Sequence, residues 1–322
     1  MPLPHHTLAW PRIHAMMRRN DSGHPSKTRN FRDMQGLRYE APTTIEAVVA
    51  LLTGAPAGSR ILAGGTDVIV QMETDLIEPP LLVDIKKIAE LRQITQESGG
   101  FRVGAATSGM DIVRHAAFCK AWPGIIDGVK LIGSIQVKGR ASIGGNLCNG
   151  SPAADSVPAI IAAGAIARVI GPNGVREVKV ETIPVGPGKT SLAKGEFIAS
   201  FFLPPRPAHS GDAYQRFTPR TEMDIAVVGV GINLTLDGSG TCTAARVALG
   251  AVAPTVLLVK ECADALIGSK VDDHALERLA AAASAACRPI DDKRGTKEYR
   301  IKVAGVLARR TAVEALARAR QN

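Results

Sequence analysis

The sequence predicts an α+β protein with two structured parts, and three observations support this prediction. Short apolar segments alternate with helical patterns as far as residue 203. The proline-rich residues 204–207 then interrupt the pattern and indicate a domain boundary. Beyond them, strand segments joined by a tight turn come first and alanine-rich helices follow. With 322 residues, 45% hydrophobic and 21% charged, the chain has the length of two ordinary domains and the composition of a soluble globular protein.

The first part combines strands with short helices. A helix is expected from Thr43-Thr44 to Gly54, because apolar residues recur at helical spacing after two hydroxyls that can cap it. Further helices are expected at 108–118 and 156–163. Apolar runs predict strands near residues 60–63, 81–85, 101–106, 165–170, 175–180 and 196–203.

The second part predicts a three-stranded antiparallel sheet with helices. Its strands are expected at 213–217, 226–236 and 242–249, and the Asp-Gly-Ser-Gly turn at 237–240 joins the last two as a hairpin. Helices are expected at about 255–267, 272–286 and 296–319. The expected domain limits are therefore 34–207 and 212–318.

Residues 1–33 have no hydrophobic period, so they are expected to be a disordered extension or a mis-assigned start. Arg18-Arg19 resembles a twin-arginine export signal, but the polar residues 20–24 follow where an apolar stretch belongs. No apolar run reaches the roughly 18 residues needed to cross a bilayer. These features predict a cytoplasmic protein.

Charge and cysteine spacing disfavour two classes of function. The net charge is +9, but residues 1–33 hold six basic residues and two acids, and the other basic residues are scattered without interleaved aromatics. This pattern is not typical of nucleic-acid binding. Five cysteines are dispersed with no C-x-x-C pair, so neither a zinc site nor an iron–sulfur cluster is expected in this chain. No catalytic motif such as G-x-S-x-G or H-E-x-x-H is present, and no catalytic residue is predicted.

Two glycine segments carry the functional signal. Gly64-Gly65-Thr66-Asp67 and Ser142-Ile143-Gly144-Gly145-Asn146 follow strand or loop segments. Glycine reaches positive φ and lets another group approach the backbone closely, and successive N–H groups in a turn form an anion site. Two such loops are suited to hold the two phosphates of a dinucleotide from opposite sides. Each segment alone is more often a tight turn, and neither is a G-x-G-x-x-G fingerprint or a P-loop.

A family resemblance distinguishes the pair from ordinary turns. From about Met34 to Arg310 the chain resembles the FAD-binding subunits of the xanthine dehydrogenase and carbon monoxide dehydrogenase family of molybdenum hydroxylases. Five segments carry the resemblance in order: Ile61-Leu62-Ala63-Gly64-Gly65-Thr66-Asp67-Val68, the second glycine segment, Ser151-Pro152-Ala153-Ala154-Asp155-Ser156-Val157-Pro158, Arg220 to Ala226, and Arg294 to Arg300.

The resemblance implies a two-subdomain FAD-binding domain of the PCMH type followed by a smaller α+β domain. It assigns the FAD pyrophosphate to the amides of residues 61–68 and 142–146. It also places Asp155 on a polar part of the cofactor, Ile198 at a backbone contact and Arg216 near the flavin. Asp155 is equally explained as a helix N-cap, Ile198 as a strand residue and Arg216 as a surface cation. Ile132 stands where some relatives have an aromatic residue.

The same resemblance implies a function. One FAD would accept electrons from [2Fe-2S] clusters on a small subunit, while a large molybdopterin subunit hydroxylates the substrate, in a dimer of heterotrimers. Because neither glycine segment contains a His or a Cys, the FAD is expected to be non-covalent. The chain alone would not hydroxylate, because hydroxylation in this family needs a metal centre and this sequence has neither clustered cysteines nor a metal-ligand spacing. The resemblance fixes neither the substrate nor the electron acceptor. The alternatives are a stand-alone flavin oxidase or reductase with the same fold, and a basic interaction protein without flavin.

Overall fold

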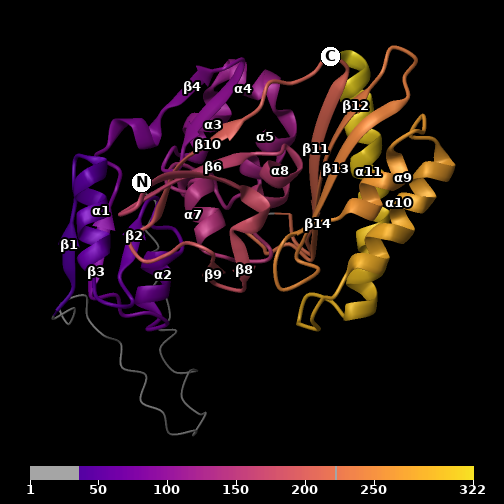
Figure 1. Cartoon of the computed structure of the whole chain (residues 1–322). Coiled ribbons are helices and arrows are strands. Elements are labelled where there is room, and N and C mark those ends of the chain that lie inside the picture. Colours follow the sequence, from indigo (N-terminus) through magenta and orange to yellow (C-terminus); the bar gives the residue numbers. More distant parts are fainter. Residues whose placement is uncertain (1–35, 222) are drawn as a thin grey trace, which may run out of the picture. The chain divides into compact units, whose positions relative to one another are not determined.

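Figure 1 shows the computed structural model, which describes residues 36–221 and 223–322. The predictions for residues 1–33 lie outside the described residues. From Leu37 to Asn322 the chain forms one unit. Among the described residues, no helix has both the length and the apolar character needed to cross a membrane.

A small parallel sheet opens the described chain. Its strands β1 (Arg38–Glu40), β3 (Leu81–Asp84) and β2 (Arg60–Leu62) lie in that order. Helix α1 (Ile45–Gly54) begins where the Thr44 hydroxyl accepts a hydrogen bond from the Ala47 N–H, so the predicted hydroxyl cap is present. All four residues of β3 are buried, which fits the middle strand of a covered sheet. Strand β2 leads directly into the first glycine segment, and α2 (Val68–Glu73) follows it.

A five-stranded sheet forms the second subdomain, in the order β4 (Ile94–Glu97), β5 (Gly100–Gly104), β10 (Phe197–Leu203), β6 (Ile166–Gly171) and β7 (Gly174–Lys179). All of its neighbouring strands are antiparallel. Its helices are α3 (Gly109–Arg114), α4 (Ala116–Ala121), α5 (Pro123–Lys130), α6 (Ile135–Lys138), α7 (Ile143–Cys148) and α8 (Ser156–Ala162). The remaining elements here are the 3-10 turns Ala89–Arg92 and Val180–Thr182, and the paired strands β8 (Pro184–Gly186) and β9 (Lys189–Thr190).

The helix expected at 108–118 is interrupted at His115. The His115 backbone is extended, and its ring Nδ1 accepts a hydrogen bond from the Phe118 N–H at 3.1 Å. The histidine therefore ends α3 and caps α4. A side chain that caps a helix offers the backbone a partner outside the helical ladder, which explains a break that the apolar period does not show.

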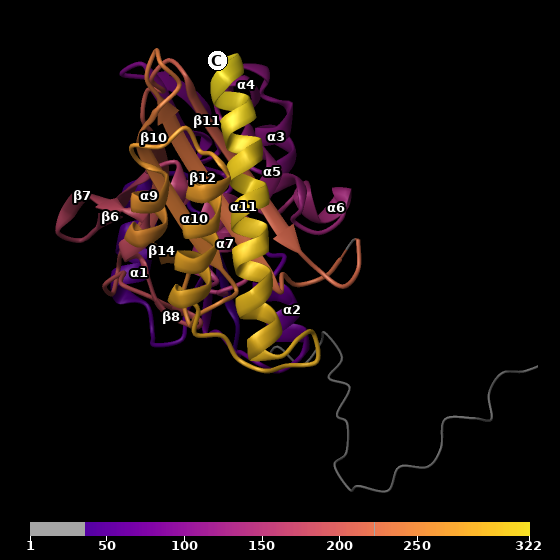
Figure 2. The ribbon, with the colours of Figure 1, turned by 90° about the vertical axis from the view of Figure 1, so that its right-hand side faces the viewer.

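The C-terminal sheet contains β11 (Ser210–Phe217), β12 (Val228–Leu236), β13 (Cys242–Gly250) and β14 (Leu257–Leu258). Helices α9 (Lys260–Leu266), α10 (Asp273–Ala286) and α11 (Lys297–Gln321) cover one face of it (Figure 2). The three expected antiparallel strands are present, and β14 adds a fourth. Residues Leu257 and Leu258 pair with β13, so the helix expected from about 255 begins only at Lys260.

The other face of this sheet packs on the subdomain that contains the five-stranded sheet. Gly231 of β12 lies against α8, where a Cβ would stand 2.5 Å from the Pro158 carbonyl oxygen. Side chains of α8 and of β11 share one hydrophobic cluster. Glycine in the strand therefore allows the two layers to touch backbone to backbone.

Candidate functional site

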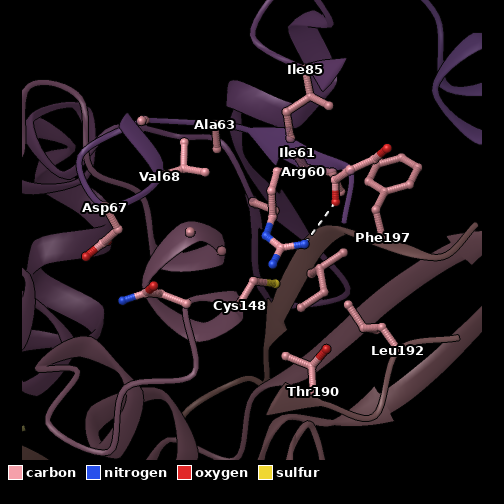
Figure 3. A pocket seen from close by; sticks show the side chains of 18 of the residues that line it. Arg60, Ile61, Ala63, Asp67, Val68, Ile85, Cys148, Thr190, Leu192 and Phe197 are labelled. Atoms are coloured by element: carbon pink, nitrogen blue, oxygen red, sulfur yellow. Dashed lines mark hydrogen bonds between the residues drawn. The ribbon is translucent and has the colours of Figure 1, made fainter. Parts of the chain in front are cut away.

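A cavity of about 840 Å³ lies where the first subdomain meets α7 and the segment leading into β10 (Figure 3). Its volume falls in the range of small-molecule and cofactor sites. Twelve of the predicted binding residues line it: Ile61, Ala63, Gly64, Gly65, Thr66, Asp67, Val68, Ser142, Gly144, Gly145, Asn146 and Ile198. The structure thus brings together two segments about 80 residues apart in sequence.

Close backbone packing holds these two segments side by side. A Cβ on Gly64 would lie 2.1 Å from the Arg140 carbonyl oxygen, directly before the second segment. A Cβ on Gly144 would lie 2.5 Å from the Ala105 carbonyl oxygen. Both glycines are therefore required for contact between protein backbones, a role different from the ligand approach that the sequence suggested.

The first segment, residues 61–68, presents unsatisfied donors. Within the described chain, the backbone N–H groups of residues 64–68 donate to no acceptor, and the Thr66 hydroxyl has no partner. Gly65 has φ +81°, a conformation that favours glycine and turns the chain between β2 and α2. Loss of water at the cavity wall raises the pKa of Asp67. Five successive free N–H groups in the wall of a cavity are suited to bind an anion.

The second segment, residues 142–146, is the first turn of helix α7 and its cap. The Ser142 hydroxyl accepts from the Gly145 N–H at 3.1 Å, and the Ser142 carbonyl accepts from the Asn146 N–H at 2.9 Å. The Gly144 N–H donates to the Ala105 carbonyl at 3.1 Å. Three N–H groups that the sequence suggested for a ligand are thus bonded to the protein itself.

Asn146 links this turn to α8. Its Oδ1 accepts from the Ser156 N–H at 3.2 Å and from the Ser156 hydroxyl at 2.7 Å. These bonds orient the side-chain amide, whose Nδ2 has no acceptor in the described chain. Among residues 144–146 of the described chain, the free donor is therefore this side chain and not a backbone N–H group.

Four predicted residues lie outside the cavity wall. Leu62 and Ile143 are buried in the core. Asp155 and Arg216 meet each other instead, with Arg216 Nη1 2.5 Å from Asp155 Oδ2, and the Tyr214 hydroxyl donates to Asp155 Oδ1 at 2.9 Å. Asp155 precedes α8 but makes no side-chain capping bond, so it does not act as a helix N-cap. Arg216 is buried, so it is not a surface cation. Burial outweighs the nearby Arg216 charge and raises the pKa of Asp155 to about 6.

Several wall residues were not identified from the sequence. Residues 55–59, in the turn between α1 and β2, line the cavity. Ile132, to which the resemblance assigned a position, lines it as well. Gln71 Nε2 donates to Asn149 Oδ1 at 3.0 Å, which ties α2 to the end of α7. Cys148 opens onto the cavity, where the surrounding protein raises the pKa of its thiol to about 12.

Comparison with known proteins identifies the class of this fold. Residues 30–206 match the family described as the FAD binding domain in molybdopterin dehydrogenase, and residues 213–315 match the CO dehydrogenase flavoprotein C-terminal domain. The chain belongs to this family of FAD-binding medium subunits of molybdenum hydroxylases. The resemblance seen in the sequence and the predicted fold class are therefore confirmed.

Two relatives and two solved structures illustrate the similarity. The carbon monoxide dehydrogenase medium chain of Afipia carboxidovorans is 34% identical over 88% of this chain and 97% of its own length. The xanthine dehydrogenase FAD-binding subunit of Escherichia coli O157:H7 is 30% identical over 87% and 96%. A crystal structure of Cu,Mo-CO dehydrogenase matches with a TM-score of 0.84 at 34% identity, covering 88% of this chain and 98% of that one. Quinoline 2-oxidoreductase from Pseudomonas putida 86 matches with a TM-score of 0.81 at 26% identity and the same coverage.

The residues of the cavity fit the cofactor that the family implies. A dinucleotide needs an elongated cavity with donors for its phosphates and apolar walls for its rings. The free N–H groups of residues 64–68 supply the donors. Ile61, Ile132 and Ile198 supply apolar wall.

Proposed function

We propose that this chain holds one FAD non-covalently in the cavity and transfers electrons as the flavin subunit of a cytoplasmic molybdenum hydroxylase. Its domains would span 34–207 and 212–318. Electrons would arrive from [2Fe-2S] clusters on a small subunit, substrate would react on a large molybdopterin subunit, and the assembly would be a dimer of heterotrimers. The observation that carries the proposal is the run of five N–H groups in a wall of the cavity that have no acceptor among the described residues. The family of the chain supports the partner arrangement.

The chain's residues would bind and orient the cofactor. The N–H groups of residues 64–68 would hold the diphosphate, and the Asn146 Nδ2 would donate from the opposite side. When bound, the flavin supplies redox chemistry that accepts and releases electrons one at a time. No side chain of this chain is assigned a chemical step.

Asp155 and Arg216 do not line the cavity and would act on the flavin from behind its wall. Asn146 bonds to Ser156, the neighbour of Asp155, so the pair lies directly behind a wall residue. The buried Arg216 guanidinium, only 6% exposed, would favour negative charge on the reduced flavin. Asp155 offsets part of that charge and fixes the position of the guanidinium.

The cavity favours a non-covalent cofactor. Neither glycine segment contains a cysteine or a histidine, and Cys148, two residues beyond Asn146, is the nearest thiol. No histidine lines the cavity in the described part of the chain.

The full-length chain, purified alone, tests the proposal. We expect one flavin per chain, fully released into the supernatant by acid precipitation, with at most slow transfer from NADH or a dye to an artificial acceptor. Aldehydes, purines and N-heterocycles should be oxidised only after the partner subunits are added. Colour retained in the pellet contradicts non-covalent binding. Efficient substrate oxidation by the lone chain favours a stand-alone oxidase, and a protein that takes up no flavin favours a basic interaction protein.

A further inference from the structure

The charges around the cavity are unevenly matched. Four charged side chains line it: Arg60, Asp67, Lys194 and Glu196. Glu196 is neutralised by Arg176, whose Nε and Nη2 each lie 2.8 Å from a carboxylate oxygen. Neither Arg60 nor Lys194 has a carboxylate partner among the described residues. Asp67 has no ion-pair partner among the described residues either, so the unpaired side chains of the cavity are two cations and one carboxyl group.

Arg60 is the better positioned of the two. It lies on β2, where its backbone is registered with Leu82 of the neighbouring strand, and it directly precedes the segment with free N–H groups. Figure 3 shows its side chain extending into the cavity. Its Nη1 donates to the carbonyl oxygens of Gly58 at 3.1 Å and Ser59 at 3.2 Å. These bonds hold the guanidinium in place and leave Nε and Nη2 without acceptors in the described chain.

Two arginines of the second subdomain behave differently. Arg102 pairs with Glu97, and Arg176 forms two parallel bonds to Glu196. A guanidinium presents a planar fork of donors that suits carboxylate and phosphate equally well. Because Arg60 lacks a carboxylate and faces a cavity, its fork is available to an anionic ligand.

The neighbouring N–H groups alone leave a charge deficit. Backbone amides offer partial charges but no net charge, whereas a diphosphate carries about two negative charges and keeps most of its hydration in water. Moving it into a cavity is costly unless a cation accompanies it. We propose that Arg60 binds the diphosphate of the dinucleotide and supplies the charge that the N–H groups of residues 64–68 lack. This inference rests on the proposed FAD site and names one further residue of it.

Binding of a graded ligand series to the full-length chain tests this assignment. Dissociation constants for FAD, ADP, AMP and adenosine are measured by calorimetry for the wild type, Arg60→Gln and Arg60→Lys. Arg310→Gln is the matched control, because Arg310 is an exposed arginine on α11 that does not line the cavity. A lost charge-assisted hydrogen bond weakens binding about tenfold to hundredfold.

We expect Arg60→Gln to weaken the binding of FAD and ADP by about tenfold or more and the binding of AMP less. The affinity for adenosine should not change. Its ADP affinity should also depend less on salt than that of the wild type. Arg60→Lys should recover part of the loss, and Arg310→Gln should match the wild type. Adenosine has no phosphate, so its affinity distinguishes the loss of a phosphate contact from general damage to the cavity.

Two results would overturn the assignment. Unchanged ADP affinity in Arg60→Gln, or an equal loss for adenosine and ADP, would show that Arg60 does not act on the phosphates. Either result leaves the FAD site itself intact, provided that the wild type still binds FAD. A wild type that binds no FAD would instead refute the proposed function and this inference together.

Discussion

The two glycine segments look alike in sequence but differ in structure. Residues 61–68 run from β2 through a loop into α2, and the five successive N–H groups of residues 64–68 have no acceptor in the described chain. Residues 142–146 begin a helix, and three of their N–H groups are bonded to Ser142 or Ala105. The first segment is therefore built to bind an anion, and the second is built to hold the cavity wall in shape.

This difference shows that the glycines of such motifs have different structural roles. Gly64 and Gly144 allow backbone segments to touch, and Gly65 turns the chain at positive φ. Gly145 differs from them, because a Cβ there would meet only the Ser142 hydroxyl, at 3.2 Å, and would otherwise find open space. Each of these roles predicts a different outcome on substitution.

The largest effect is expected from Gly64→Ala. The new Cβ would lie 2.1 Å from the Arg140 carbonyl oxygen, and neither backbone can move without separating the two segments. We expect the free energy of unfolding to fall by about 3 kcal/mol or more, together with loss of flavin. Thermal melting and flavin content measure the two effects. The control is Gly238→Ala, in a hairpin turn with no neighbour within 4 Å, and a stable, flavin-loaded Gly64→Ala protein would refute the packing role.

A loss of flavin with little loss of stability is expected from Gly145→Val. The side chain would extend past the Ser142 hydroxyl into space that the cofactor needs. We expect FAD affinity to fall by about a hundredfold or more, whereas the melting temperature changes little because valine is no worse than glycine in a helix. Equilibrium titration with FAD gives the affinity, and Gly238→Val serves as the matched control. Normal flavin content in the folded variant would exclude Gly145 from the cofactor's path.

Asp155→Asn should change the pH dependence of stability. The pKa of Asp155 is raised from 3.8 to about 6 in the folded protein, so the folded state holds a proton that the unfolded state has already released. Its contribution to stability is therefore complete below about pH 4 and is lost as the pH rises through 6, by up to about 3 kcal/mol. Denaturant unfolding at several pH values should show this decline in the wild type and a flatter profile in the variant. If the stability of the wild type and of the variant changed with pH in the same way, the raised pKa of Asp155 would be contradicted.

The smallest effects give the sharpest contrast between the two segments. Thr66→Val removes a free hydroxyl from the first segment and should weaken FAD binding about twofold to tenfold without changing the stability of the fold. Ser142→Ala removes the cap of α7 and should lower stability by about 1 kcal/mol with less effect on affinity. Melting curves and FAD titrations of both variants test the contrast. The reverse pattern, with Thr66 affecting stability and Ser142 affecting affinity, would exchange the roles of the segments.

The sequence predicted the parts of the site that local patterns encode. Apolar runs located β2 and β10, and the glycine motifs located both segments that line the cavity. Local patterns missed the helical character of residues 143–148, because the two glycines masked a capping serine that begins a short helix. They also missed the two-residue strand β14, which is too short to show a period.

Tertiary contacts decided the remainder. The pairing of Asp155 with Arg216 joins residues 61 positions apart, and nothing in either local sequence shows that they meet. The turn of residues 55–59 has no motif, yet it lines the cavity because β2, which follows it, pairs with β3. Arg60 was not predicted as a site residue, because only the fold shows that it lines the cavity and lacks a carboxylate partner among the described residues.

A structure of the full-length chain with FAD bound tests the central claim most directly. The account predicts that the diphosphate oxygens lie within hydrogen-bonding distance of the N–H groups of residues 64–68, with the internal hydrogen bonds of residues 144–146 retained. Electron density for FAD outside this cavity, or a diphosphate held by the N–H groups of residues 144–146 alone, would contradict it.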